Sequence, residues 1–303
     1  MEKINIFIAD DIDLSKLDLF PKAKFNIIFK PGLDNKSILK YITPIDCLII
    51  RSTRMIDKKF LDSCNMKIIA TCSRGVDNID TKYAELKNIK IIYSGGANSI
   101  SAAEHTVGLI LEVFKRISLS DKIVREGNFK NTEFERRELY GKKIGIIGIG
   151  KVGSHVAKIS HAFGMKIIAN EIDINVKKTH KNLDFRPLSF LLKHSDIISV
   201  HIPFTKENSK FISKEKLELL NENSVFINTS RGGVIDEKHL IKLLKAGKIK
   251  FAALDVFEHE PYINPEFFKL GNVILTNHIA GKTIESSVKI AKDIFLQIYN
   301  FCL

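Results

Sequence analysis

A glycine-rich stretch near the middle of the chain, KIGIIGIGKVG over residues 143–153, constrains the fold more than any other feature. Its β-branched residues predict a buried strand, and the apolar residues that follow recur at helical spacing as far as Phe163. A second apolar run then ends at Glu171, eighteen residues after Gly153. Strand, G-x-G-x-x-G, helix, strand and acid in this order form the pattern of a dinucleotide-binding unit.

Each position of this pattern has its own task. Gly148 allows the tight turn, Gly150 lets the backbone approach a pyrophosphate, and Gly153 lets the helix pack close to its strand. The N-terminus of the helix offers N–H groups to the phosphates, and Glu171 accepts hydrogen bonds from ribose hydroxyls. The sequence therefore predicts that the chain binds a dinucleotide.

Composition narrows the class of protein. The 303 residues exceed one typical domain, so two domains are expected. Four dispersed cysteines show no metal-ligand spacing, which favours reduced thiols in a cytoplasmic protein without a metal. No apolar run reaches the ~18 residues of a membrane span, and the N-terminus has no signal-peptide pattern. The net charge of +12 lacks the dense basic run typical of nucleic-acid binding, and fits either a lysine-rich bias or a field that attracts small anions.

The chain predicts the α/β class, as two doubly wound parallel-sheet domains with a cleft between them. In the first half, apolar runs alternate with amphipathic segments, and no glycine-rich loop follows the first strand. Polar residues gather instead at 51–54 and 73–78, after the third and fourth strands, where open α/β sheets bind ligands. This half is expected to bind the substrate. Its expected strands are Ile4–Ala9, Phe25–Phe29, Cys47–Ile50, Ile68–Thr71 and Ile89–Tyr93, with helices near 12–20, 34–42, 57–63 and 80–87.

The second domain is expected to be a Rossmann dinucleotide-binding domain over residues 98–282, and the first to comprise 1–97 plus 283–303. A long helix at 98–117 leads into the second domain, and a final helix at 283–299 returns to cover the first. The expected strands are Ile144–Ile147, Ile167–Ala169, Ile197–Val200, Val225–Asn228, Phe251–Leu254 and Val273–Leu275, with helices at 152–163, 188–194, 213–220 and 236–246 and an irregular segment at 125–142.

Three stretches at the ends of late strands contain Arg231, Glu260 and His278. Hydride transfer to a ketone leaves an alkoxide, so a proton donor must lie against that oxygen, and histidine titrates near neutrality. A carboxylate beside the imidazole favours its protonated form, and an arginine anchors a substrate carboxylate or polarises the carbonyl. The three side chains therefore predict hydride transfer at a carbon that bears oxygen.

Neighbouring residues compete for these roles. Glu258 is a rival acid and His259 a rival base, and the proline that follows Glu260 favours Glu260. His105 lies within a helical pattern and is expected to be structural. His201 is expected to line the adenine pocket.

The whole chain resembles the D-isomer-specific 2-hydroxyacid dehydrogenases, and most closely the short-form D-3-phosphoglycerate dehydrogenases. The resemblance runs from Arg51-Ser52 through 75–80 and 103–105 to the glycine motif and the three stretches above. It implies a flavodoxin-like first domain, NAD as cofactor, and oxidation of a D-2-hydroxy acid to the 2-oxo acid. The expected reaction is 3-phospho-D-glycerate to 3-phosphohydroxypyruvate, in serine biosynthesis. The resemblance also implies a homodimer with residues 99–117 and 125–142 at the contact.

The resemblance assigns Arg231, Glu260 and His278 as the catalytic residues, and the backbone of 74–77 as the site of the substrate carboxylate. Arg51 and Arg54, two arginines at one strand end, suit a phosphorylated acid. The full set of expected cofactor contacts is Gly148, Gly150, Lys151, Val152, Gly153, Glu171, His201, Thr229, Ser230, Asp255 and Gly281. The expected substrate contacts are Arg51, Ser52, Arg54, Arg74, Gly75 and Val76.

Two alternatives stay open. A hydroxypyruvate or glyoxylate reductase of the same family shares the His-Ile-x-Gly-x-Thr run that begins at His278. A non-catalytic, NAD-sensing, corepressor-like protein of the same fold retains the three catalytic residue types. For the cofactor, Glu171 favours NAD over NADP, because it repels a 2′-phosphate and no arginine occurs in 172–175 to bind one.

Overall fold

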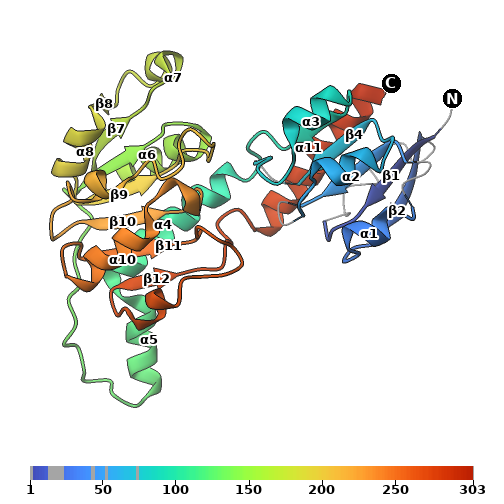
Figure 1. Ribbon diagram of the computed structural model, residues 1–303. Coiled ribbons are helices and arrows are strands. Elements are labelled where there is room, and N and C mark those ends of the chain that lie inside the picture. Colours follow the sequence, from blue (N-terminus) through green and yellow to red (C-terminus); the bar gives the residue numbers. More distant parts are fainter. Residues whose placement is uncertain (1–2, 13–23, 42–44, 52–53, 73–74, 303) are drawn as a thin grey trace. The chain divides into compact units, whose positions relative to one another are not determined.

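The computed structural model describes residues 3–12, 24–41, 45–51, 54–72 and 75–302 (Figure 1). The chain divides into two compact units, a first unit of Met1–Asn98 with Lys282–Leu303 and a second unit of Ser99–Gly281. The helix expected near 12–20, and the predicted site residues Ser52 and Arg74, lie outside the described residues.

The first unit contains a parallel five-stranded sheet in the order β2-β1-β3-β4-β5. This order is one of the two common doubly wound arrangements. Short apolar runs form the strands, and every residue of β3 and β4 is buried. The strands predicted in this half are confirmed, each to within one residue. They are β1 (Ile4–Ile8), β2 (Phe25–Phe29), β3 (Cys47–Ile50), β4 (Ile68–Thr71) and β5 (Lys90–Tyr93).

Helices cover both faces of this sheet. On one face lie the short helices α1 (Asn35–Ile38), α2 (Lys58–Asp62) and α3 (Thr81–Leu86). An aspartate caps each of the three helices and accepts a hydrogen bond from a first-turn N–H group. On the other face, α11 (Ile284–Cys302) packs Ile290, Ile294 and Ile298 against the strands. The prediction that the final helix returns to the first domain is confirmed.

The second unit contains a parallel seven-stranded sheet in the order β12-β11-β10-β9-β6-β7-β8. The strand order reverses at β6, which pairs with β7 on one side and β9 on the other. The carboxyl ends of such strands are where doubly wound sheets bind ligands. The strands are β6 (Lys143–Ile147), β7 (Lys166–Asn170), β8 (Asp184–Phe185), β9 (Ile197–Val200), β10 (Val225–Asn228), β11 (Phe251–Leu254) and β12 (Val273–Leu275).

The helices of this unit follow the predicted pattern with two additions, α5 and α7. Within the described residues, no helix has the length and apolar content of a membrane span. The helices are α4 (Ser99–Lys115), α5 (Ile117–Arg125), α6 (Lys151–Ala162), α7 (Ile174–Thr179), α8 (Leu188–His194), α9 (Lys214–Leu217) and α10 (Glu237–Lys245), with 3-10 turns at Gly232–Val234 and Pro265–Lys269.

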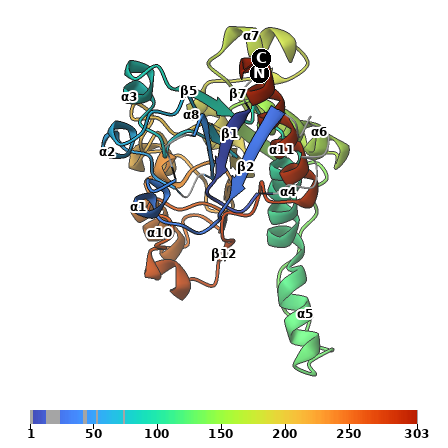
Figure 2. The same cartoon turned by 90° about the vertical axis from the view of Figure 1, so that its right-hand side faces the viewer.

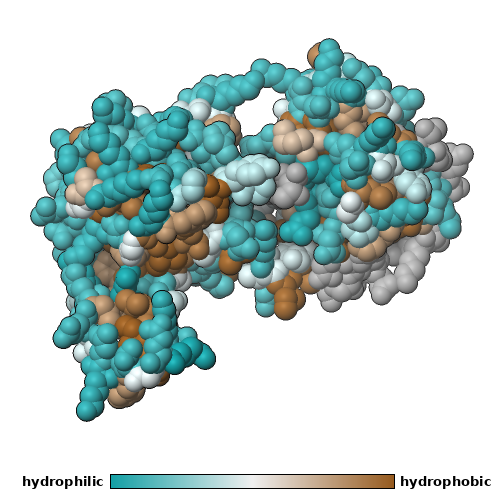
Figure 3. Space-filling view, turned by 60° about the horizontal axis from the view of Figure 1, so that its bottom comes forward, coloured by the Kyte–Doolittle hydropathy of each residue, from teal (hydrophilic) through white to brown (hydrophobic). Residues whose placement is uncertain are grey.

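The helix expected at 98–117 is interrupted. Arg116 has left-handed backbone angles, and its guanidinium lies 4.7 Å from the ring of Phe251. The chain then continues as α5, which projects from the rest of the second unit (Figures 1 and 2). No residue of α5 is buried, and Ile117 and Val124 are exposed. Figure 3 shows hydrophobic side chains on this projecting arm, residues 117–138.

Candidate active site

The glycine motif forms a tight turn between β6 and α6. Gly148 has a φ of +89°, and a Cβ there would lie 2.8 Å from the carbonyl oxygen of His201. A Cβ at Gly153 would lie 2.0 Å from the oxygen of Gly148, so neither position accepts a side chain. Gly150 precedes the first turn of α6, whose N–H groups have no acceptor within the helix. The loop therefore fits the pyrophosphate of a dinucleotide.

Glu171 follows β7 and closes onto this loop. Its Oε2 accepts the N–H of Ile149 at 2.8 Å. Its Oε1 accepts the N–H groups of Ile172 at 2.7 Å and Asp173 at 3.0 Å. Three backbone donors thus hold a carboxylate beside the glycine loop. His201 borders the same loop, and its Nε2 lies 2.8 Å from Ser199 Oγ.

Arg231 lies on the loop that follows β10. The fully buried Asn228 organises this loop. Asn228 Oδ1 accepts hydrogen bonds from the N–H and the hydroxyl of Ser230, and Asn228 Nδ2 donates to the carbonyl of Arg231. Arg231 Nη1 donates to the carbonyl of Ser230 at 2.8 Å. Thr229 Oγ1 lies 2.8 Å from the hydroxyl of Thr106 on α4. The side chains of Thr229 and Ser230, which were expected to contact the cofactor, therefore have partners within the protein.

His278 and Glu260 are in direct contact. His278 Nδ1 lies 2.6 Å from Glu260 Oε2, and Glu260 Oε1 accepts the N–H of Phe257 at 3.0 Å. An ionised carboxylate only accepts, so Nδ1–H is the donor and Nε2 is left to act on a substrate. The two side chains are 36% and 34% exposed, so the pair is accessible to a ligand.

The surroundings of Glu260 keep it ionised. Burial raises the pKa of this carboxyl group, but the hydrogen bond and charge of His278, the N–H of Phe257 and the charge of Arg231 outweigh burial. The pKa of Glu260 is therefore held below its usual range. An ionised Glu260 favours the protonated state of the imidazole beside it.

Asp255 is fully buried and holds the loop that carries His278. Its Oδ1 accepts hydrogen bonds from Thr276 Oγ1 at 2.6 Å and from the N–H of Ile279 at 2.9 Å, and its Oδ2 accepts the N–H of Ala280 at 2.9 Å. Burial raises the pKa of Asp255, but its contacts with His105 and Thr276 and the N–H groups of Ile279 and Ala280 hold that pKa below its ordinary value. These contacts give Asp255 a structural role in the loop, and its contact with the cofactor stays a prediction.

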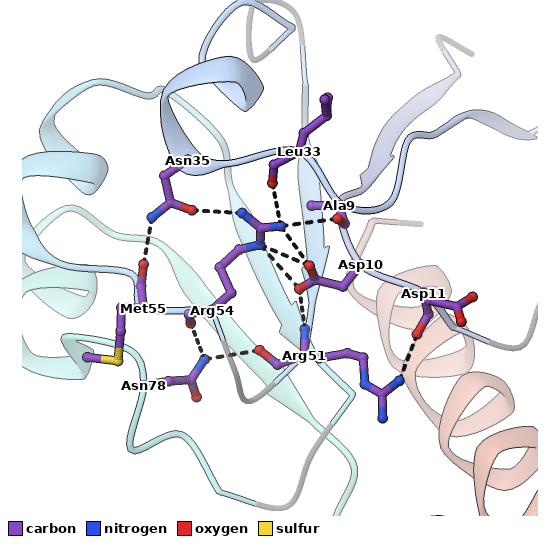
Figure 4. Close-up of polar contacts among 9 residues, drawn as sticks. All are labelled: Ala9, Asp10, Asp11, Leu33, Asn35, Arg51, Arg54, Met55 and Asn78. Carbon is purple, nitrogen blue, oxygen red and sulfur yellow. Dashed lines mark hydrogen bonds and ion pairs between the residues drawn. The ribbon is translucent and has the colours of Figure 1, made fainter. Parts of the chain in front are cut away.

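Arg54 is held inside the first unit (Figure 4). Its guanidinium donates to the carboxylate of Asp10, to Asn35 Oδ1, and to the carbonyls of Ala9 and Leu33. The Arg54 and Asp10 side chains are 10% and 14% exposed. All three guanidinium nitrogens are engaged within the first unit, which indicates a structural role for Arg54 and leaves its substrate contact a prediction.

Arg51 is directed away from that network (Figure 4). Its backbone N–H donates to Asp10 Oδ2 at 2.8 Å, and its Nη1 donates to the carbonyl of Asp11 at 3.2 Å. Of the two arginines, Arg51 is the remaining candidate for a substrate phosphate. Gly75 and Val76 are half-buried, and the carbonyl of Val76 accepts the N–H of Ile79.

The remaining predicted cofactor contacts lie at the ends of elements of the second unit. Lys151 and Val152 open α6, and Gly281 is the last residue of the unit. The described residues contain no group of three or more side chains suited to hold a metal ion. Sequence reasoning left Asn228, Thr276 and Ser101 out of the site. The roles of Thr276 and Ser101 depend on hydrogen bonds to residues 21 and 179 positions away in the chain. Asn228 instead organises its own loop, through a hydrogen bond to a residue three positions away.

Comparisons with known proteins agree with this geometry. The family model described as "D-isomer specific 2-hydroxyacid dehydrogenase, NAD binding domain" matches residues 107–280. The D-3-phosphoglycerate dehydrogenase of Archaeoglobus fulgidus is 34% identical over 302 residues, which cover 98% of this chain and 57% of that protein. The hydroxypyruvate reductase of Thermotoga maritima is 33% identical over 304 residues, which cover 99% of each chain.

A solved structure gives the same result. The D-lactate dehydrogenase of Aquifex aeolicus, in complex with NAD and lactic acid, matches with a TM-score of 0.85 and 28% identity, covering 98% of this chain and 95% of that one. The chain spans just over half the length of the phosphoglycerate dehydrogenase that it matches. With the two parallel sheets and the glycine loop at the switch point, the match confirms the resemblance seen in the sequence. The chain belongs to the D-isomer specific 2-hydroxyacid dehydrogenase family, and its second unit contains that family's NAD-binding domain.

Proposed function

We propose that this protein oxidises a D-2-hydroxy acid to the corresponding 2-oxo acid with NAD, and that 3-phospho-D-glycerate is its preferred substrate. The observation that carries the reaction type is the 2.6 Å contact between His278 Nδ1 and Glu260 Oε2. Both residues follow strands of the parallel sheet whose switch point bears the glycine loop. Family membership supports the same chemistry.

His278 is the general base of the oxidation. Its Nε2 takes the proton of the substrate hydroxyl while Nδ1–H donates to Glu260, and the carboxylate stabilises the imidazolium that forms. NAD, when bound at the glycine loop, supplies the acceptor for the hydride that leaves C2. In the reverse reaction the imidazolium returns its proton to the carbonyl oxygen, which becomes the hydroxyl.

Arg231 anchors the substrate carboxylate through its guanidinium. The Asn228 network fixes the backbone of Arg231, which limits the positions that its guanidinium reaches. A guanidinium and a carboxylate form paired, charge-assisted hydrogen bonds. Such an anchor orients C2 of the substrate toward His278.

NAD is proposed as the preferred dinucleotide. The carboxylate of Glu171 is fixed by three backbone N–H groups and lies beside the glycine loop. A 2′-phosphate on the ribose would meet this negative charge. The described residues that follow, 172–175, contain no arginine to offset it.

The substrate assignment depends on Arg51. Its guanidinium is not part of the Asp10 network that engages Arg54, which leaves it able to bind a 3-phosphate. One arginine binds a phosphate more weakly than the predicted pair would. A hydroxypyruvate or glyoxylate reductase, whose substrate has no phosphate, is therefore the second candidate function. The hydroxypyruvate reductase of Thermotoga maritima, which matches over the full length of both chains, supports that alternative.

A comparison of substrates with matched variants tests the assignment. The purified chain is assayed for NAD-dependent oxidation of 3-phospho-D-glycerate and of D-glycerate, and for NADH-dependent reduction of hydroxypyruvate and glyoxylate. We expect a preference for the phosphorylated acid that Arg51→Ala largely removes, since charge-assisted hydrogen bonds contribute about 1.5–3 kcal/mol each. Lys59→Ala, which removes an exposed charge from α2, is the control and should retain the preference.

The outcomes separate the candidates. Equal turnover of the two hydroxy acids, with efficient reduction of hydroxypyruvate, would replace the phosphoglycerate assignment by the reductase. NAD binding without turnover of any 2-hydroxy or 2-oxo acid would favour the NAD-sensing, corepressor-like alternative.

We also propose that the protein is a homodimer, as the family resemblance implies. We propose a cytoplasmic location, because the reducing cytoplasm keeps thiols such as its four free cysteines reduced.

A further inference from the structure

Helix α4 contacts the loops that carry two of the proposed catalytic residues, His278 and Arg231. Ser101 Oγ donates to the carbonyl of Ala280 at 2.8 Å. His105 Nε2 lies 3.2 Å from Thr276 Oγ1. Residues 101 and 105 are four apart and so share one face of the helix. This face of α4 therefore holds the loop of residues 276–280 near both of its ends.

The direction of each hydrogen bond around His105 follows from its neighbours. Thr276 uses its only proton in the 2.6 Å bond to Asp255 Oδ1, so its oxygen can only accept from His105. Asp255 Oδ1, 3.5 Å from His105 Nε2, is also an acceptor. His105 therefore presents an Nε2–H donor to two acceptors. The donor completes the set of partners around the buried carboxylate of Asp255.

The loop needs such support because of the conformation of His278. His278 has a φ of +54°, in the left-handed region that residues with a Cβ rarely adopt. Its backbone persists there only when the surroundings over-determine it. Asp255 binds Thr276 on one side of His278, and Ile279 and Ala280 on the other. A single carboxylate thus holds a side chain before the proposed base and the backbone after it.

Helix α4 also contacts the loop that carries Arg231, through Thr106. Thr106 is fully buried and donates its hydroxyl proton to the carbonyl of Ala102 at 2.7 Å. Thr229 must therefore be the donor in the 2.8 Å contact between the two hydroxyls. Thr106 follows His105 directly, so adjacent residues of one helix reach the two loops.

We propose that His105 is a positioning residue: through Thr276 and Asp255 it fixes the loop that presents His278, and α4 holds that loop in register with the loop of Arg231. The assignment extends the sequence-based expectation that His105 is merely structural. As a role in catalysis it rests on the proposed function. The claim that His105 braces the 276–280 loop depends only on the hydrogen bonds described above.

Two substitutions test the role of the Nε2–H donor. His105→Leu removes the donor, whereas His105→Gln keeps an N–H at a similar distance from the backbone. We expect His105→Leu to lower kcat by on the order of 10–10²-fold, the effect of misplacing a catalytic group by about 1 Å. KM for the hydroxy acid and Kd for NAD should change less than about threefold, since neither contact is removed. His105→Gln should restore most of kcat.

Hydrogen–deuterium exchange measures how firmly the 276–280 loop is held, and it does not depend on enzyme activity. The amides of Ile279 and Ala280 should exchange about tenfold faster in His105→Leu than in wild type, and at close to the wild-type rate in His105→Gln. His161→Leu, which alters an exposed histidine of α6, is the control and should change neither kcat nor this exchange. If His105→Leu does not fold, Ser101→Ala removes one hydroxyl from the same helix face and should speed exchange at Ala280.

The outcomes distinguish this inference from the proposed function. Unchanged amide exchange in the 276–280 loop of His105→Leu, or of Ser101→Ala in its place, would overturn the brace. A glutamine variant as impaired as the leucine variant would overturn the role of the donor. If wild type turns over no hydroxy acid, the proposed function fails, and the exchange measurements still decide whether α4 braces the loop.

Discussion

His278 illustrates how a single residue can be costly for the fold and necessary for the site. A left-handed backbone costs a residue with a Cβ about 1–2 kcal/mol, which glycine would avoid. The imidazole is held against Glu260 in this conformation. The buried Asp255 accepts hydrogen bonds from the hydroxyl of Thr276 before His278 and from the N–H groups of Ile279 and Ala280 after it. The strain at His278 is therefore offset by hydrogen bonds of its neighbours.

Glu260→Gln should change the pH dependence of oxidation. The carboxylate stays ionised because its pKa is lowered, and it favours the imidazolium of His278. Oxidation requires the neutral imidazole, so the rate falls at low pH where the imidazole is protonated. Loss of the negative charge makes that protonation harder, and the acid limb of kcat/KM should move to lower pH. An acid limb at the wild-type position would exclude Glu260 from this role.

Glu171→Ala should narrow the preference for NAD over NADP. Removal of the carboxylate beside the glycine loop eliminates its repulsion of a 2′-phosphate. The ratio of kcat/KM for NAD to kcat/KM for NADP, measured at one fixed concentration of the hydroxy acid, reports the change in cofactor preference. A wild-type enzyme that prefers NADP would refute the proposed preference for NAD.

The sequence predicted residue types at the site better than their contacts. The glycine loop, Glu260 and His278 are recognisable because each lies in a short motif after a strand. Arg51 and Arg54 occur in one such motif, yet Arg54 turns to the carboxylate of Asp10. No spacing rule indicates this pairing, because the two residues are 44 positions apart in the chain.

At the scale of the elements, most strands and helices were predicted from the sequence, whereas β8, α5 and α7 were not. Buried strands of parallel sheets are continuous apolar runs, which are visible in the sequence. The strand β8 has two residues, too few for a periodic pattern, and α7 buries no residue, so its sequence needs no apolar face. The break before α5 depends on Arg116, whose left-handed backbone and contact with Phe251 join distant segments.

Arg54→Met should destabilise the first unit. Removal of the guanidinium leaves the carboxylate of Asp10, 14% exposed, without its ion-pair partner. Breaking a buried pair from one side costs about 3–5 kcal/mol, and the partial exposure of this pair favours the lower end. Urea unfolding of the full chain measures the change. Arg51→Ala is the matched control, and an equal loss of stability in both variants would contradict the distinction between them.

The projecting arm should contribute to a dimer. Ile117 and Val124 of α5 are exposed and lie seven positions apart on one face of the helix. We expect wild type to sediment as a dimer at micromolar concentration and the double variant Ile117→Glu/Val124→Glu to shift toward monomer. Ser118→Glu, on another face of α5, should remain dimeric. A monomeric wild-type protein would contradict the proposed homodimer.

At the scale of the whole molecule, the sequence predicted both parallel sheets and the helix that returns to the first unit. The net charge of +12 agrees with an anionic substrate and an anionic cofactor, but it does not distinguish one acid from another. That distinction depends on individual contacts such as those of Arg51. The reaction type depends on fewer residues, and one experiment addresses it.

The most direct test measures NAD reduction by wild type and by His278→Ala with 3-phospho-D-glycerate and with D- and L-glycerate. Wild type should reduce NAD with a D-acid and not with L-glycerate. His278→Ala should lose on the order of 10²–10⁴-fold in kcat, the contribution of a general base, while its Kd for NAD stays close to that of wild type. Full activity of His278→Ala, or turnover of L-glycerate alone, would contradict the assignment of a D-2-hydroxyacid dehydrogenase with His278 as its base.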